Sequence, residues 1–244
     1  MNRILALLIV FVFCLSPTIA NSQSARLADQ HWNKAQALNK SGEYLEAAKM
    51  YVKSAEAEQA SQRPRMRELA LTFQKAGEMY WQVGRYDKAI EHYQQALAIA
   101  RRQGQEGFIA NSLNNIGMVY RSWGQFDKAI SHLQRALAID RKLGREAGIA
   151  TRLSNIGLVY HSWGQYDKAI DHFRQGLVIA RRLGSEAERN QDLKGIEWTS
   201  TSIAGDLSNI GGVYHSWGQY DKAIDHFQQA LVIARRLGTE AIAG

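Results

Sequence analysis

The fold is decided by the stretch NIGMVYRSWGQFDKAI, residues 115–130, because the sequence contains it more than once. Nearly the same letters recur at residues 155–170 and again at residues 209–224. Two more diverged copies precede them, around Gly84 and Gly42. Self-similarity at a period near forty residues is typical of repeat architectures, in which each unit buries its apolar face against its neighbours. The sequence therefore predicts five stacked units.

The spacing of the turn glycines sets the unit boundaries. From Gly42 the intervals are 42, 40, 40 and 54 residues, so the last interval holds about fourteen extra residues. The only stretch without a counterpart, 189–202, accounts for them, and we expect a flexible insert there. The predicted segments are a signal peptide (1–20), a linker (21–26), unit one (27–66), unit two (67–106), unit three (107–146), unit four (147–187), an insertion (188–202) and unit five (203–244).

Each unit reads as two helices joined by a tight turn. In unit four, we expect a first helix over 146–163, a break at Gly164, and a second helix over 165–183 that ends at Gly184. The first helix has one apolar face with helical spacing, formed by Leu153, Ile156, Gly157 and Tyr160. A hairpin of this size cannot bury such a face alone, so the prediction is an all-α solenoid.

The residue pattern of the hairpin resembles the tetratricopeptide repeat (TPR), in the forty-residue version found in kinesin light chain, LGN-type adaptors and bacterial arrays. Unit four carries the pattern as Gly157, Tyr160, Gly164, Tyr166, Ala169 and Phe173. It departs from the family where Gly176 replaces the usual Ala. The resemblance runs from about Leu27 to the C terminus. It implies a right-handed superhelix whose first helices line a concave groove.

The N terminus has the features of a secretory signal. Arg3 is followed by a twelve-residue apolar stretch, 4–15, and by a small residue, Ala20, at which a signal peptidase can cut. The apolar run is too short to span a bilayer comfortably, and no later window replaces it. Cys14 raises a lipoprotein alternative, but Phe13 precedes it where a lipobox has a small residue. We expect an extracytoplasmic protein, periplasmic or secreted, without a transmembrane span after cleavage.

The exposed face of the first helices is the predicted binding site for a protein or an extended peptide. It is neutral and polar, and the same position holds Asn in four units and Lys75 in the remaining one. An amide offers a donor and an acceptor together, which suits the backbone of an extended peptide. The alternative to peptide contact is that these amides are hydrated or form hydrogen bonds with neighbouring helices. The predicted groove residues are Asn33, Lys75, Asn111, Asn115, Met118, Ser122, Asn155, Leu158, Ser162, Asn209, Gly212 and Ser216.

Several repeated side chains have more ordinary interpretations. Trp123, Trp163 and Trp217 are expected in the core between repeats. The histidines recur at the repeat spacing, which is too wide for a shared metal ion, so neither a metal nor a cofactor is expected. Basic pairs before the helix-ending glycines are expected to be solvated residues at helix C termini. In the insertion, Trp198 is a possible anchor for a partner.

These features favour a noncatalytic scaffold that binds a protein or peptide. A sensor of a signalling peptide is the alternative. An enzyme fits less well, because the sequence contains no nucleophile elbow, phosphate loop or metal motif. Nucleic acid is not an expected partner, since no aromatic platform accompanies the basic pairs. The last repeat ends without a polar capping helix, which predicts self-association or docking of a partner there.

Overall fold

The computed structural model describes the backbone of residues 22–243 and the side chains of residues 22–236. The predicted signal peptide lies outside the described residues. Residues 22–26, expected to form a linker, already belong to the first helix, which spans 22–40. The described part of the chain contains helices and turns and no strand.

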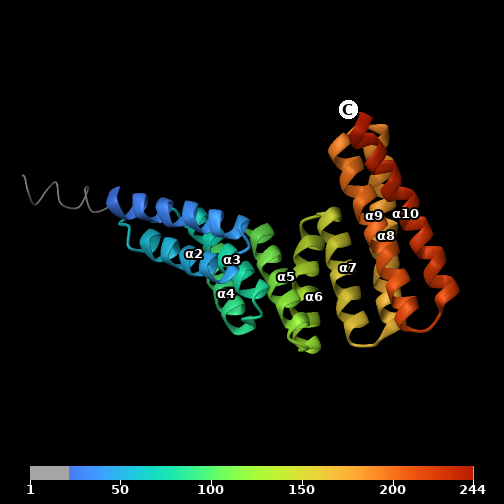
Figure 1. Ribbon diagram of the computed structural model, residues 1–244, viewed down its shortest axis with the longest axis horizontal. Coiled ribbons are helices and arrows are strands. Elements are labelled where there is room, and N and C mark those ends of the chain that lie inside the picture. Colours follow the sequence, from blue (N-terminus) through green and yellow to red (C-terminus); the bar gives the residue numbers. More distant parts are fainter. Residues whose placement is uncertain (1–21, 244) are drawn as a thin grey trace, which may run out of the picture. The chain divides into compact units, whose positions relative to one another are not determined.

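The helices follow one another as hairpins (Figure 1). After the first helix come α2 (Tyr44–Gln59), α3 (Met66–Gln82), α4 (Tyr86–Arg102), α5 (Glu106–Ser122), α6 (Phe126–Lys142), α7 (Glu146–Ser162), α8 (Tyr166–Arg189), α9 (Leu193–Ser216) and α10 (Tyr220–Ala243). This arrangement confirms the predicted all-α repeat array. The chain forms two compact units, 1–112 and 113–244, and α5 crosses the boundary between them.

The turn inside each hairpin depends on its glycine. Gly164 has a φ of +75°, a left-handed conformation that other residues adopt only with strain. The following amide, Gln165 N–H, donates to the Tyr160 carbonyl at 2.8 Å and so satisfies a carbonyl at the end of α7. The glycines at the same position of the other hairpins behave alike: Gly42, Gly84, Gly124 and Gly218.

Within a hairpin, a second glycine lets the two helices approach closely. A Cβ placed on Gly157 of α7 would lie 2.8–3.0 Å from the ring of Phe173 on α8, which is closer than packed carbons allow. Phe173 is completely buried. Gly211 and Phe227 have the same relation in α9 and α10. The small residue at the position of Gly157 therefore makes room for the aromatic ring of the second helix.

The expected insertion is not a loop. Helices α8 and α9 each have 24 residues, against 17 in α7, and these two extensions of seven residues contain the fourteen extra residues. Gly184, expected to end α8, lies inside the helix next to Thr199 of α9. The turn falls instead at Gln191, with a φ of +54°. The flexible insert was therefore a wrong prediction, since the two extensions pack on each other.

The tryptophans before the turn glycines are not buried, although Trp163 and Trp217 do contact the preceding repeat, with their rings 5.8 Å from those of Phe126 and Tyr166. Trp123, Trp163 and Trp217 are 44%, 38% and 39% exposed. Each lies against the tyrosine three residues earlier, at ring-centroid distances of 6.3–6.5 Å, as in the pair Tyr160–Trp163. Because they follow the last helical residue, they cover the edge of the stack at the turns and do not enter its centre.

The outer face of α10 is apolar and open to solvent. Phe227 is 42% exposed, whereas its counterpart Phe173 on α8 is buried under α9. The side chains that share this face are Tyr220, Ile224, Phe227 and Leu231. None of the helices in the described part of the chain combines the length and apolar content that a membrane crossing requires.

Candidate peptide-binding groove

Two of the predicted groove residues meet in the second unit. Asn155 of α7 and Asn209 of α9 line the same hollow, which has a volume of about 250 Å³. Trp198, from the extended part of α9, is also in its wall. The other lining residues are Thr151, Ser154, Thr201, Ser202, Gly205 and Asp206. We call this site the α7–α9 hollow.

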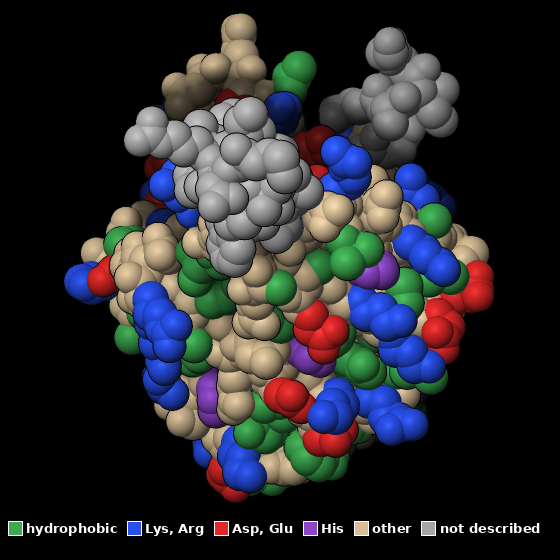
Figure 2. All heavy atoms as spheres, turned by 90° about the vertical axis from the view of Figure 1, so that its left-hand side faces the viewer, with side chains coloured by type: hydrophobic (Ala, Val, Ile, Leu, Met, Phe, Trp, Pro, Cys, Tyr) green, Lys and Arg blue, Asp and Glu red, His purple; other side chains and the backbone are tan. Residues whose placement is uncertain are grey.

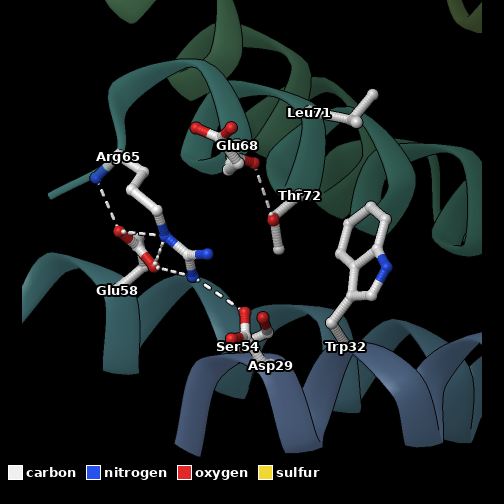
Figure 3. A pocket seen from close by; sticks show the side chains of 8 residues that line it. All are labelled: Asp29, Trp32, Ser54, Glu58, Arg65, Glu68, Leu71 and Thr72. Carbon is white, nitrogen blue, oxygen red and sulfur yellow. Dashed lines mark hydrogen bonds and ion pairs between the residues drawn. The ribbon is translucent and has the colours of Figure 1, made fainter. Parts of the chain in front are cut away.

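A second hollow occupies the corresponding place in the first unit, between the first helix and α3 (Figure 3). Its volume is about 120 Å³. In the repeat register, Asp29 corresponds to Thr151, and Thr72 corresponds to Asp206. Hollows thus recur where consecutive first helices face each other. Trp32 forms one side of this one.

A single arginine closes the other side of that hollow. Arg65, just before α3, reaches Glu58 of α2 at 2.7 Å and Asp29 of the first helix at 2.8 Å (Figure 3). Both carboxylates raise the pKa of the guanidinium, and Glu58 is nearly fully buried. Arg65 therefore pairs with Asp29 and Glu58, while Glu68, the third acid of the lining, takes no part in this ion pair.

Between α5 and α7 the amides bond to each other. The Asn155 side-chain NH₂ donates to Oδ1 of Asn114 at 2.7 Å, and the Asn114 NH₂ donates to Oδ1 of Asn115 at 3.3 Å. Asn155 therefore bonds to a neighbouring helix through its side-chain NH₂, and its contact with a peptide stays a prediction. The bond fixes the side chain beside the α7–α9 hollow.

The other predicted residues lie along the same helices and do not all meet. In the first unit, Asn33 and Asn111 are exposed, and Lys75 is ion-paired with Glu78 at 2.8 Å. In the second unit, Met118, Leu158 and Gly212 are half-buried, while Ser122, Ser162 and Ser216 are exposed. The Ser216 hydroxyl lies 3.0 Å from Nε2 of His161, which joins α9 to α7. Their role in binding stays a prediction.

Sequence reasoning missed two buried charges in the first helices. Arg152 of α7 and Asp206 of α9 occupy the same repeat position, which is Ser112 in α5, and both are nearly fully buried. The signal available in the sequence was a charged residue at a position on the apolar, buried face of the first helix. Arg152 Nε lies 3.1 Å from Oδ2 of Asp140 on α6, and Arg145 lies 3.4 Å from Oδ1 of the same carboxylate.

Asp206 has no such basic partner. Its Oδ2 is without a hydrogen-bond partner among the described residues, and the side chain is 2% exposed. Burial raises the pKa of Asp206 to about 6, although the Ser154 hydroxyl acts in the opposite direction. Gly176 leaves room for the carboxylate, because a Cβ there would lie 3.1 Å from Oδ2. Gly176, where the family usually has Ala, therefore lies close to the buried carboxylate.

The histidines that recur in the second helices form hydrogen bonds within those helices. In α6, α8 and α10 the Nδ1 atoms of His132, His172 and His226 lie 2.8–2.9 Å from the carbonyl oxygen four residues earlier, which assigns the proton to Nδ1. A lysine also lies over the neighbouring tyrosine ring, as Lys168 does over Tyr160 at 5.4 Å. Among the described residues, no group of three or more His, Cys, Asp or Glu side chains has the arrangement of a metal site.

The basic pairs do not all lie at helix ends. Arg101 and Arg102 occupy the last turn of α4, as predicted, but Arg181 and Arg182 lie inside α8 because that helix runs on to Arg189. Arg182 instead pairs with Glu146 and Glu186. On the face shown in Figure 2, lysine and arginine side chains gather on the right-hand part of the view, and acidic side chains lie near its centre and at its right edge.

Comparisons with known proteins agree with the fold. The tetratricopeptide repeat pattern matches residues 27–102, 108–182 and 207–241. No curated protein matches the sequence. Among solved structures, the chain is similar to BtubC (BKLC) from P. vanneervenii, with 23% identity, coverage of 92% and 90% of the two chains, and a TM-score of 0.68. It is also similar to the kinesin light chain TPR-like repeats of Podosopora anserina, with 19% identity, coverage of 88% and 97%, and a TM-score of 0.63.

A third similar structure is a Rap protein complexed with competence and sporulation factor. Identity is 20% and the TM-score is 0.65. The match covers 84% of this chain but only 53% of the Rap chain, so this chain spans about half of that protein. At these identities the structures show the fold alone. With the family pattern matched over most of its length and hairpins of the expected form, the chain belongs to the tetratricopeptide repeat family.

Proposed function

We propose that this protein is a noncatalytic scaffold that holds an extended segment of another protein against its first helices, outside the cytoplasm. The observation that carries the proposal is the α7–α9 hollow, because two amides and an aromatic side chain converge there. Amides can hold a peptide backbone without reading its side chains, and tryptophan supplies apolar contact area. TPR proteins as a family bind proteins or peptides in this way.

Replacing both amides tests the groove. In Asn155→Ala/Asn209→Ala, we expect affinity for a peptide selected from a random displayed library to fall about tenfold, since each lost hydrogen bond costs about 0.5–1.5 kcal/mol. Fluorescence anisotropy of the labelled peptide measures the change. Asn190→Ala, in the exposed turn between α8 and α9, is the matched control and should bind as the parent does. Equal affinity for all three proteins would place the peptide elsewhere.

The proposed location rests on the N-terminal sequence. Expressed in a bacterium with an export system, the mature chain should begin at Asn21, after cleavage at Ala20. N-terminal sequencing of the protein from the periplasm or medium checks this. Recovery of the uncleaved chain from the cytoplasm alone would contradict it.

A peptide sensor is the second candidate, favoured by the similarity to a Rap protein solved with a bound factor. A sensor must bind its ligand more tightly in one conformation than in another. Small-angle scattering with the selected peptide separates the two functions, because compaction on saturation indicates a sensor and an unchanged profile indicates a passive scaffold.

For the apolar face of α10, the occupant that we propose is a second copy of this chain. Two α10 helices packed antiparallel about Phe227 bring Asp221 of one copy beside the partner's Arg235, at both ends of the contact. Opposite charges and a shared apolar centre are what a two-fold interface needs.

A charge at the centre of this face tests the dimer. Phe227→Asp should shift the sedimentation profile from dimer to monomer, because it places a carboxylate in the apolar contact. Val178→Asp is the control, since Val178 is an exposed apolar residue on α8, away from the proposed contact. A parent that sediments as a monomer at every concentration would rule the interface out.

A further inference from the structure

We propose that the α7–α9 hollow is a specificity pocket for a basic side chain, arginine or lysine, with Asp206 as its counter-ion and Trp198 as its aromatic wall. The inference rests on the proposed peptide-binding function and adds which side chain the groove selects. Asp206 and Trp198, which form the proposed pocket, are not among the asparagine positions of the groove.

The first observation is the acid itself. Asp206 lines the hollow and is nearly fully buried, and one of its oxygens has no hydrogen-bond partner in the described part of the chain. Burying a carboxylate without a charged partner is costly. A cation delivered into the hollow would supply the missing partner and recover part of that cost.

The second observation is a matched contact one repeat earlier. There, Arg152 stands at the position of Asp206 and pairs with Asp140 of α6. In the next contact the Asp140 position is Ala180, which carries no charge, and the acid has moved to α9. In one repeat contact the buried carboxylate, Asp140, therefore has an arginine partner within the protein. In the next contact the carboxylate, Asp206, has none and lies beside an open hollow.

The third observation is the chemistry of the walls. Trp198 provides an aromatic face, which attracts guanidinium and ammonium groups. Thr151, Thr201 and Ser202 carry hydroxyls that can accept hydrogen bonds from a cationic head. No Lys or Arg is among the residues that line this hollow, whereas in the first-unit hollow Arg65 pairs with Asp29 and Glu58.

The probe is the capped pentapeptide acetyl-Ala-Ala-Arg-Ala-Ala-amide, compared with its citrulline counterpart, which has the same shape without the charge. The full chain is labelled with ¹⁵N at the tryptophan indoles, and the Trp198 signal is identified with Trp198→Phe. We expect a saturable shift of the Trp198 signal with the arginine peptide and at least tenfold weaker binding of the citrulline peptide at pH 7.5. The difference should shrink below pH 6, as Asp206 becomes protonated.

Asp206→Asn is the decisive variant, and Asp171→Asn, an exposed acid on α8, is its control. The first should bind arginine and citrulline peptides equally, while the second should behave as the parent. Far-UV circular dichroism confirms that both are folded. Equal binding of the two peptides by the parent, no shift of Trp198 with either peptide, or unchanged selectivity in Asp206→Asn overturns the pocket.

The same titrations separate this proposal from the general one. If both peptides bind equally and Asn155→Ala/Asn209→Ala weakens both, the groove stands and the basic pocket falls. If arginine selectivity depends on Asp206 but the amide variant binds normally, the pocket stands and the amide-based groove falls.

Discussion

Arg152→Met is expected to lower the free energy of unfolding by about 3 kcal/mol, because it leaves Asp140 buried beside a single, more distant arginine. Asp140 is fully buried and the Arg152 side chain is 6% exposed, so water cannot replace the lost partner. Methionine keeps most of the volume, which limits the contribution from a cavity. Urea unfolding followed by circular dichroism measures the change.

The control removes the other charge as well. In Asp140→Ala/Arg152→Met, the position of Asp140 takes the residue that the chain uses at Ala100 and Ala180. Stability should return to within about 1 kcal/mol of the parent, since replacing both members of a buried pair is often neutral. A double variant as unstable as Arg152→Met would mean that packing, and not the unpaired charge, causes the loss.

At the same position of the next repeat, the opposite result is expected. Asp206→Asn should raise the free energy of unfolding by about 2 kcal/mol at pH 7.5, because it removes a buried carboxylate without a basic partner. Below pH 4 the gain should vanish, since Asp206 is then protonated in both the folded and the unfolded chain.

The pH window follows from the direction of the shift. The pKa of Asp206 in the folded chain, about 6, lies above its ordinary value, so the folded state binds more protons between pH 4 and pH 6. The contribution of this group to stability is present at low pH and is lost as the pH rises through 6. Urea unfolding of the parent and the variant at pH 4 and pH 7.5 checks it. A constant difference at both pH values would contradict the assignment.

The sequence predicts most of the fold because its signals are local and repeated. Gly164 and its counterparts mark the turns, and Gly157 with Phe173 marks the close contact within the hairpin. The end of α8 could not be predicted this way. Gly104 and Gly144 end their helices with positive φ, but Gly184 at the same position does not, because Thr199 of the extended α9 packs against it. The turn residue used instead, Gln191, carries no turn signal.

The site was predictable only in part, for a related reason. The polar face and Asn155 and Asn209 follow from the helical period. Whether two such residues share a hollow depends on the side chains that lie between the helices. One of these is Trp198, which lies in the wall only because the residues predicted as a flexible insertion extend α9. A residue such as Asp206 shows its charge in the sequence, but the absence of a partner appears only in three dimensions.

The most direct test of the account is a titration of the full chain with the library-selected peptide, followed by ¹⁵N signals of the tryptophan indoles and asparagine side chains. We predict that the signals of Asn155, Asn209 and Trp198 shift together and saturate at one affinity. Shifts confined to Trp123, Trp163 and Trp217 at the turns, with the Asn155, Asn209 and Trp198 signals unchanged, would contradict it.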